Sequence, residues 1–191
     1  MFTKGECRSR FRLMRDRLSD EEYARLNEQL LNGFKEISLK DIRYIHTFLP
    51  ILHQREPNTF LVIEYLRTVW PDIKIIVPRS DLQTNLMTHH VLWPNQELTR
   101  NRWGIIEPHE SDEVIEEELI DLILLPLLAF DKKGGRVGYG KGYYDRFLNL
   151  CKDNAQKVGL SLFGPVDRII DIQPHDVPLD RCITPDKIWE F

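Results

Sequence analysis

The sequence predicts a single α/β domain of three layers, in which helices cover both faces of a mostly parallel sheet. Apolar runs of strand length alternate along the chain with segments of helical periodicity, an order typical of parallel sheets. A length of 191 residues with 42% hydrophobic residues suffices for one substantial core but not for two full domains. We therefore expect residues 1–191 to form one domain.

Two helices are expected within residues 1–38, as a helical segment packed on that domain. Apolar residues recur at helical spacing from Phe11 to Leu18 in an arginine-rich stretch, which predicts a basic amphipathic helix. Ser19-Asp20-Glu21-Glu22 has the pattern of a capping box, so a second helix should begin there and continue to about Ile37.

The elements that follow are predicted from hydrophobic periodicity and β propensity. Strands are expected at 42–49, 73–77, 119–125 and 158–162, and a helix is expected at 58–69. Residues 92–118 are polar, contain prolines and show poor periodicity. We expect them to form loops that border a site.

The most informative segment is the glycine-rich turn after the apolar run at 122–130. Five of the ten glycines lie between Gly134 and Gly142, together with Arg136 and Lys141. Glycine permits positive φ and lets backbone amides approach a ligand closely, while the two cations add positive charge. This combination predicts a polyphosphate site; a flexible turn with solvated lysines is the alternative.

Helical spacing from Tyr144 to Cys151 predicts that this turn leads into a helix, with Gly142 and Tyr143 at its amino end. Unpaired amides at that end attract anions. The segment also comes within one residue of a Walker A loop, but Gly142 stands where that loop has the Ser or Thr hydroxyl that binds magnesium. Asp145 is a candidate ligand in its place, or it caps its own helix.

Longer motifs connect these residues. Pro126-x-x-Ala129-Phe130-Asp131 is followed by Gly134-x-Arg136-x-Gly138-x-Gly140-Lys141-Gly142-Tyr143-Tyr144-Asp145. Weaker motifs are Lys4-x-x-x-Arg8, Glu56-x-x-Thr59, Pro78-Arg79, Gly104-Ile105-x-Glu107-Pro108 and His175-Asp176-x-x-x-Asp180. In content and order these motifs resemble the 5-formyltetrahydrofolate cyclo-ligase family, also called 5,10-methenyltetrahydrofolate synthetase.

The resemblance implies an α/β/α enzyme that uses ATP and magnesium to cyclise 5-formyltetrahydrofolate to 5,10-methenyltetrahydrofolate, with release of ADP and phosphate. It implies catalytic roles for Lys141 and Arg136 and a magnesium site at Asp145 and Asp176. The ATP contacts it implies are Lys4, Arg8, Gly134, Gly135, Arg136, Val137, Gly138, Tyr139, Gly140, Lys141, Gly142, Tyr143 and Tyr144. The folate contacts it implies are Glu56, Trp103, Tyr139, Gly140, Lys141, Gly142 and Tyr143.

Ordinary structural roles remain open for several of these residues. Lys4 and Arg8 share one helix face and alone would suggest a solvated pair. Glu56 would by default be an exposed loop glutamate, Trp103 a core aromatic, and Asp176 part of a proline-flanked turn. Helix geometry separates the two tyrosines: Tyr144 belongs to the apolar stripe, so Tyr143 points about 100° away and can stack on a pterin ring.

Composition narrows the partners and the compartment. A net charge of −4 argues against a dedicated nucleic-acid binder. The three cysteines include no C-x-x-C pair, so no disulfide framework or zinc site is indicated and a reducing cytoplasm is expected. The longest apolar run, at 122–130, is far shorter than the roughly 20 residues of a membrane span.

We expect a monomer that binds ATP and a folate, without nucleic-acid or membrane partners. The rival interpretation is a non-catalytic nucleotide or sugar-phosphate binding protein on the same scaffold, because a fold does not dictate activity.

Overall fold

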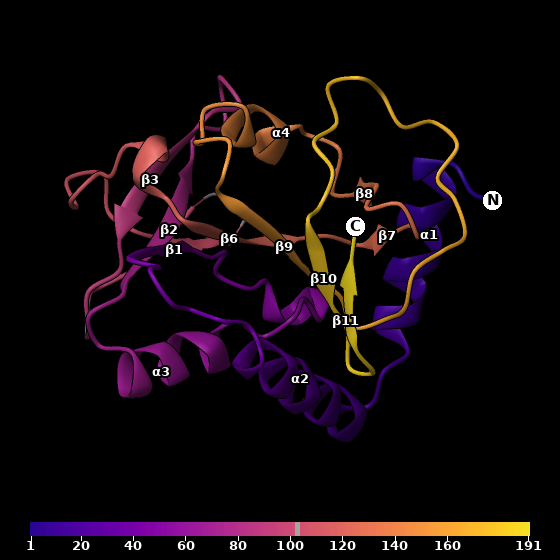
Figure 1. Ribbon diagram of the computed structural model, residues 1–191, viewed down its shortest axis with the longest axis horizontal. Helices are drawn as coiled ribbons and strands as arrows, with labels where there is room; N and C mark the ends of the chain where they lie inside the picture. Colours follow the sequence, from indigo (N-terminus) through magenta and orange to yellow (C-terminus); the bar gives the residue numbers. More distant parts are fainter. Residues whose placement is uncertain (102–103) are drawn as a thin grey trace.

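The computed structural model describes residues 1–101 and 104–191 (Figure 1). The helices there are α1 (Lys4–Asp16), α2 (Asp20–Lys35), α3 (Phe60–Val69) and α4 (Tyr143–Leu148), with 3-10 turns η1 (Leu52–Gln54) and η2 (Glu117–Leu119). The strands are β1 (Tyr44–His46), β2 (Lys74–Ser80), β3 (Met87–Val91), β4 (Thr99–Arg100), β5 (Ile106–Glu107), β6 (Leu122–Pro126), β7 (Ala129–Phe130), β8 (Arg136–Val137), β9 (Gln156–Leu160), β10 (Arg181–Ile183) and β11 (Ile188–Glu190).

A seven-stranded sheet of order β11-β10-β9-β6-β1-β2-β3 forms the centre of the domain. Its inner pairs, from β10 through β9, β6 and β1 to β2, are all parallel. The edge strands β3 and β11 pair antiparallel with their neighbours. The mostly parallel sheet predicted from the sequence is therefore confirmed.

The helices lie on both faces of this sheet, as Figure 1 shows with α2 and α3 on one side and α4 on the other. Successive side chains of β6 alternate between two cores, because a strand directs neighbours to opposite faces. Leu122 and Leu124 belong to the core shared with α2 and α3, whereas Ile123 and Leu125 belong to the core shared with α4. All four are fully buried, which explains why this segment reads as a continuous apolar run.

Helix α1 lies beside the small β7–β8 hairpin rather than on the main sheet (Figure 1). Its buried residues Cys7 and Phe11 belong to a third core with Ala129 and Val137 of the hairpin. The predicted capping box at Ser19 is confirmed, since its side chain and that of Glu22 exchange hydrogen bonds with each other's backbone N–H groups. The helical segment at 1–38 thus packs on the domain through two cores.

The structure corrects the expected boundaries around the glycine-rich turn. The strand expected at 119–125 is observed as β6, which ends at Pro126, and the rest of the apolar run forms a second strand, Ala129–Phe130, that pairs with Arg136–Val137. Proline has no N–H group with which to continue a ladder. The first part of the glycine-rich turn therefore lies within this hairpin, and the helix after the turn ends at Leu148, short of Cys151.

Candidate functional site

A cavity of about 730 Å³ lies beyond the carboxyl ends of the inner strands. Phe48 follows β1 closely, and Pro78 of β2 and Pro126 of β6 also line it. Ligands of open α/β sheets bind at this edge, because the loops that follow parallel strands converge there. The cavity therefore lies where this type of fold binds its ligands.

Most of the residues predicted from the sequence meet in this cavity. Those on its wall are Lys4, Arg8, Glu56, Arg136, Val137, Gly138, Tyr139, Gly140, Lys141, Gly142, Tyr143, Tyr144, Asp145 and Asp176. Gly134 and Gly135 do not line it, because they form the β7–β8 turn, where both of their N–H groups donate to Asp131. Trp103 lies outside the described residues.

The glycine-rich loop requires glycine at two positions where its backbone is left-handed. Gly140 and Gly142 have φ values of +94° and +71°, which side chains rarely adopt. A Cβ at Gly140 would lie 3.1 Å from a guanidinium nitrogen of Arg8, whose Nε donates to the Gly138 carbonyl at 3.0 Å. Arg8 therefore lies against the loop, and the exposed Lys141 adds a second cation from the loop itself.

Arg136 is buried and holds a neighbouring loop in place. Its Nη2 donates to Asp145 Oδ1 at 2.6 Å, and its Nε donates to the Val177 carbonyl at 3.0 Å. The Val177 N–H donates to the same Asp145 oxygen at 3.2 Å. The sequence predicted separate roles for Arg136 and Asp145, but the structure joins them in one ion pair that ties α4 to the loop containing Asp176.

Asp176 lies beside the amino end of α1. Lys4 Nζ donates to its Oδ2 at 2.5 Å, and the Gln173 N–H donates to the same oxygen at 2.6 Å. Burial opposes ionisation of this carboxyl, but the two donors outweigh it and hold its pKa below the ordinary value. Lys4 is thus an ion-pair partner of Asp176 at the cavity, and not the solvated surface cation that its sequence context alone suggested.

Glu56 is also buried, so the default interpretation of an exposed loop glutamate is wrong. Its Oε1 accepts from the Tyr139 hydroxyl at 2.5 Å, and its Oε2 accepts from the Ile51 N–H at 2.7 Å. Burial raises the pKa of the carboxyl, and these two donors oppose that effect. An ionised carboxylate offers about four lone pairs, so each oxygen can still accept a bond from a ligand.

Tyr143 and Tyr144 separate as helix geometry predicts, although both reach the cavity. Tyr144 packs against the core that contains Phe147, with ring centroids 6.1 Å apart. Tyr143 lies on the other side, and its hydroxyl donates to the Asp81 carbonyl in the β2–β3 turn at 3.1 Å. Tyr144 is therefore both a core residue and part of the cavity wall.

Most of the apolar part of the wall was not predicted from the sequence. Its residues are Phe48, Leu49, Ile51, Pro78, Met87, Ile105 and Ile106. Pro78 and Ile105 belong to motifs found in the sequence, but apolar side chains near strand ends are usually core residues, so the sequence did not assign any of the seven individually to the cavity. The expectation that part of 92–118 borders a site is confirmed by Ile105, Ile106 and Glu107.

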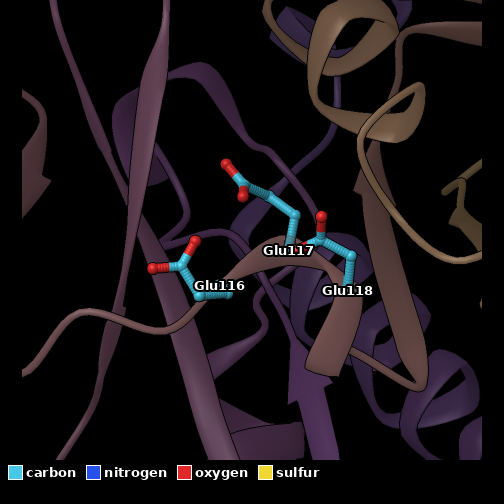
Figure 2. A group of neighbouring side chains, drawn as sticks. All are labelled: Glu116, Glu117 and Glu118. Carbon is cyan, nitrogen blue, oxygen red and sulfur yellow. The ribbon is translucent and has the colours of Figure 1, made fainter.

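A separate carboxylate group occurs at Glu116, Glu117 and Glu118, around the turn η2 (Figure 2). One oxygen of each lies within 4.8 Å of the others. Two of these residues are exposed, and none lines the cavity. This group is therefore distinct from the magnesium position predicted at Asp145 and Asp176.

No helix of the described residues is long and apolar enough to cross a membrane.

Comparisons with known proteins identify the family. Residues 1–185 match the profile of the 5-formyltetrahydrofolate cyclo-ligase family. The 5-formyltetrahydrofolate cyclo-ligase of Mus musculus is 33% identical over 96% of this chain and 92% of its own length. A Schizosaccharomyces pombe relative with the same enzyme name is 34% identical, but the match spans only 60% of this chain and 62% of the relative.

A solved structure agrees with the sequence comparisons. The 5,10-methenyltetrahydrofolate synthetase of Aquifex aeolicus superposes with a TM-score of 0.82 and 28% identity, over 98% of this chain and 92% of that one. The profile, the relatives and the fold all lead to the same group of enzymes, which is the one predicted from the glycine-rich motif. The chain belongs to the 5-formyltetrahydrofolate cyclo-ligase family.

Proposed function

We propose that this protein catalyses the ATP-dependent cyclisation of 5-formyltetrahydrofolate to 5,10-methenyltetrahydrofolate, with release of ADP and phosphate. The observation that carries the proposal is that one cavity joins a cationic glycine-rich loop to an apolar wall containing a buried carboxylate. The first feature suits a polyphosphate, and the second suits a flat heterocycle with hydrogen-bond donors.

The ATP phosphates are proposed to lie against the loop at 138–142. Lys141, Arg8 and Lys4 supply positive charge there from two different elements. Arg136 already uses part of its guanidinium on Asp145 and Val177, so it contributes by fixing the surrounding loops and through its remaining N–H groups. Positioned cations of this kind stabilise the charge that develops during phosphoryl transfer.

The folate is proposed to lie with its pterin ring near Glu56 and Tyr143. Each oxygen of Glu56 keeps acceptor capacity after its bonds to Tyr139 and Ile51, so the carboxylate can receive the amino and ring N–H groups of a pterin. Tyr143 offers a ring for stacking on the cavity wall.

The proposed chemistry begins with attack of the formyl oxygen on the γ-phosphorus of ATP, which breaks the bond to the ADP oxygen. The neighbouring folate nitrogen, which does not carry the formyl group, then attacks the activated formyl carbon, and this nitrogen loses its proton. The former formyl oxygen leaves within inorganic phosphate. Because the substrates supply the nucleophiles, the protein has only to position them and neutralise charge.

Magnesium is proposed to be held by Asp145 and Asp176. The described hydrogen bonds engage Oδ1 of Asp145 and Oδ2 of Asp176, so the other oxygen of each carboxylate fits a hard cation. Magnesium commonly takes one or two carboxylates together with substrate phosphates. When bound it would neutralise phosphate charge during transfer.

The proposal includes a monomer in a reducing cytoplasm, a compartment supported by the free cysteines Cys7, Cys151 and Cys182. A relative from Arabidopsis thaliana is named mitochondrial, so fractionation of the source cells would be the direct check on the compartment.

A coupled assay tests the proposed activity. Purified protein is incubated with ATP, magnesium and 5-formyltetrahydrofolate, and ADP, phosphate and the cyclised product are quantified together. We expect the three products in equal amounts and no ADP without the folate. ATP consumption independent of folate, or ATP binding without turnover, would favour the nucleotide-binding alternative.

A further inference from the structure

Arg15 is a buried cation in the last turn of α1, and only 2% of it is exposed. Its Nη2 donates to the Leu127 carbonyl at 2.6 Å, and its Nη1 donates to the Tyr139 hydroxyl oxygen at 3.3 Å. Among the described residues no carboxylate lies within ion-pair distance of it. Burying a charge in this way is costly unless another charge compensates it.

The compensating charge is the Glu56 carboxylate, which the Tyr139 hydroxyl connects to Arg15. Tyr139 accepts from Arg15 and donates to Glu56 Oε1 at 2.5 Å, so the phenol connects a buried guanidinium to a buried carboxylate. Burial raises the pKa of the Tyr139 phenol, which therefore keeps the proton that it donates to Glu56. Arg15 fixes the direction of that donation, because its own N–H occupies the other side of the hydroxyl oxygen.

Anchoring of α1 does not require this charge. The buried apolar residues Cys7 and Phe11 already attach the helix to the hairpin core. An apolar side chain of similar length would fill the space of Arg15 without the cost of desolvating a cation.

We propose that Arg15 is a positioning residue for folate binding: through Tyr139 it holds the Glu56 carboxylate in the orientation in which its free lone pairs face the cavity. The inference rests on the proposed role of Glu56 in binding the folate. It assigns a function to a residue that sequence reasoning treated only as part of a basic helix. It also explains how α1 serves both substrates, with Lys4 and Arg8 at the loop and Arg15 behind Glu56.

The test compares Arg15→Met with Tyr139→Phe and with the double variant, and measures KM for each substrate and kcat. Each single variant should raise KM for the folate about tenfold, because a hydrogen bond to a charged group is weakened. Arg15→Met, at a residue that does not line the cavity, should leave KM for ATP and kcat within about twofold. The double variant should be no worse than the poorer single variant, since both remove one chain of contacts. Arg17→Met, an exposed arginine at the end of the same helix, is the matched control and should behave as the parent.

Two outcomes overturn the inference. One is that Arg15→Met lowers the unfolding temperature but leaves the folate KM unchanged, which would make Arg15 only a structural residue. The other is that the two single effects multiply in the double variant. Glu56→Gln distinguishes a wrong folate site from a wrong role for Arg15. If Glu56→Gln leaves the folate KM unchanged, the proposed folate site is wrong. If Glu56→Gln raises the folate KM but Arg15→Met does not, only the inference about Arg15 is refuted.

Discussion

At the scale of single residues, Lys141 carries the charge on which the proposed phosphoryl transfer depends most directly. It is exposed between two glycines with positive φ, so its ammonium can reach a phosphate that the loop amides orient. The remaining cations near the loop have partners in the described residues: Lys4 bonds Asp176, and Arg8 bonds the Gly138 carbonyl.

Lys141→Ala should therefore lower kcat by about a hundredfold or more while leaving the denaturation midpoint unchanged, because it removes a group that stabilises developing charge. Steady-state kinetics at saturating ATP and a urea titration provide the two measurements. Lys133→Ala is the matched control, since this exposed lysine lies in the β7–β8 turn and does not line the cavity. A kcat near that of the parent would exclude a catalytic role for Lys141.

Asp145 has two proposed tasks, and one substitution separates them. Asp145→Asn keeps an oxygen for Arg136 and Val177 but removes the charge, so we expect a stability loss of about 1 to 3 kcal/mol. If Asp145 also binds magnesium, the magnesium concentration for half-maximal activity should rise about tenfold or more. Asp153→Asn, at an exposed position, should change neither quantity. A stability loss with an unchanged magnesium titration would restrict Asp145 to the ion pair.

At the scale of elements, β1 and β3 bring two buried imidazoles together between the sheet and α4. The rings of His46 and His89 lie 5.1 Å apart, and none of their nitrogens has a hydrogen-bond partner among the described residues. Burial lowers the pKa of both, that of His89 to about 4, although the partly exposed Glu117 lies 3.7 Å from His89. Both rings are therefore neutral near pH 7.

These shifts predict a loss of stability in acid. The folded pKa of His89 lies below its unfolded value of about 6.5, so the folded state binds fewer protons. The neutral His89 imidazole leaves the free energy of unfolding at its full value above about pH 6.5. As the pH falls toward 4, proton binding by the unfolded state lowers this free energy, by about 2 kcal/mol at pH 5. Urea titrations at pH 7 and pH 5 should show that His89→Gln removes the His89 share, about 2 kcal/mol, of the total decline and leaves the share of His46, whereas His109→Gln, at an exposed position, should remove none of it. Equal declines in both variants would show that His89 is not responsible.

Helix α4 provides an internal comparison between two adjacent tyrosines. Tyr144→Ala opens a cavity beside Phe147 and should cost about 3 kcal/mol or more in stability. Tyr143→Ala loses the exposed hydrogen bond to the Asp81 carbonyl and should cost about 1 kcal/mol, while weakening folate binding about fivefold through loss of stacking. Unfolding midpoints and equilibrium affinities for folate and ATP decide between them. If Tyr143→Ala binds folate as tightly as the parent, the stacking assignment is wrong.

The strands of the main sheet differ in how clearly their sequences predict them. The inner strands β2, β6 and β9 were predicted because buried parallel strands are runs of apolar residues. Strands β3, β10 and β11 were not predicted: β10 and β11 have three residues each, and β3 contains two histidines, so none of them shows a clear hydrophobic period. Their pairing is decided by neighbours far away in the chain.

At the scale of the whole molecule, one half of the site is built from residues that are adjacent in sequence, and the other half from residues that only the fold brings together. The glycine-rich loop was predicted because glycines and cations adjacent in sequence remain adjacent in space. The burial of Glu56, its bond to Tyr139 and the approach of Arg15 depend on how α1 packs against the hairpin. A local motif carries no information about such contacts. The turn glycines Gly134 and Gly135 were assigned to ATP for the converse reason, since proximity in sequence was taken as proximity to the ligand.

In the proposed reaction, a phosphoryl group passes from ATP to the formyl oxygen of the folate. The most direct test is to supply 5-formyltetrahydrofolate labelled with ¹⁸O in the formyl group and to analyse the released phosphate by mass spectrometry. Our account predicts one labelled oxygen in each phosphate formed, because the formyl oxygen leaves attached to phosphorus. Unlabelled phosphate, with the label recovered in water, would contradict phosphorylation of the formyl oxygen.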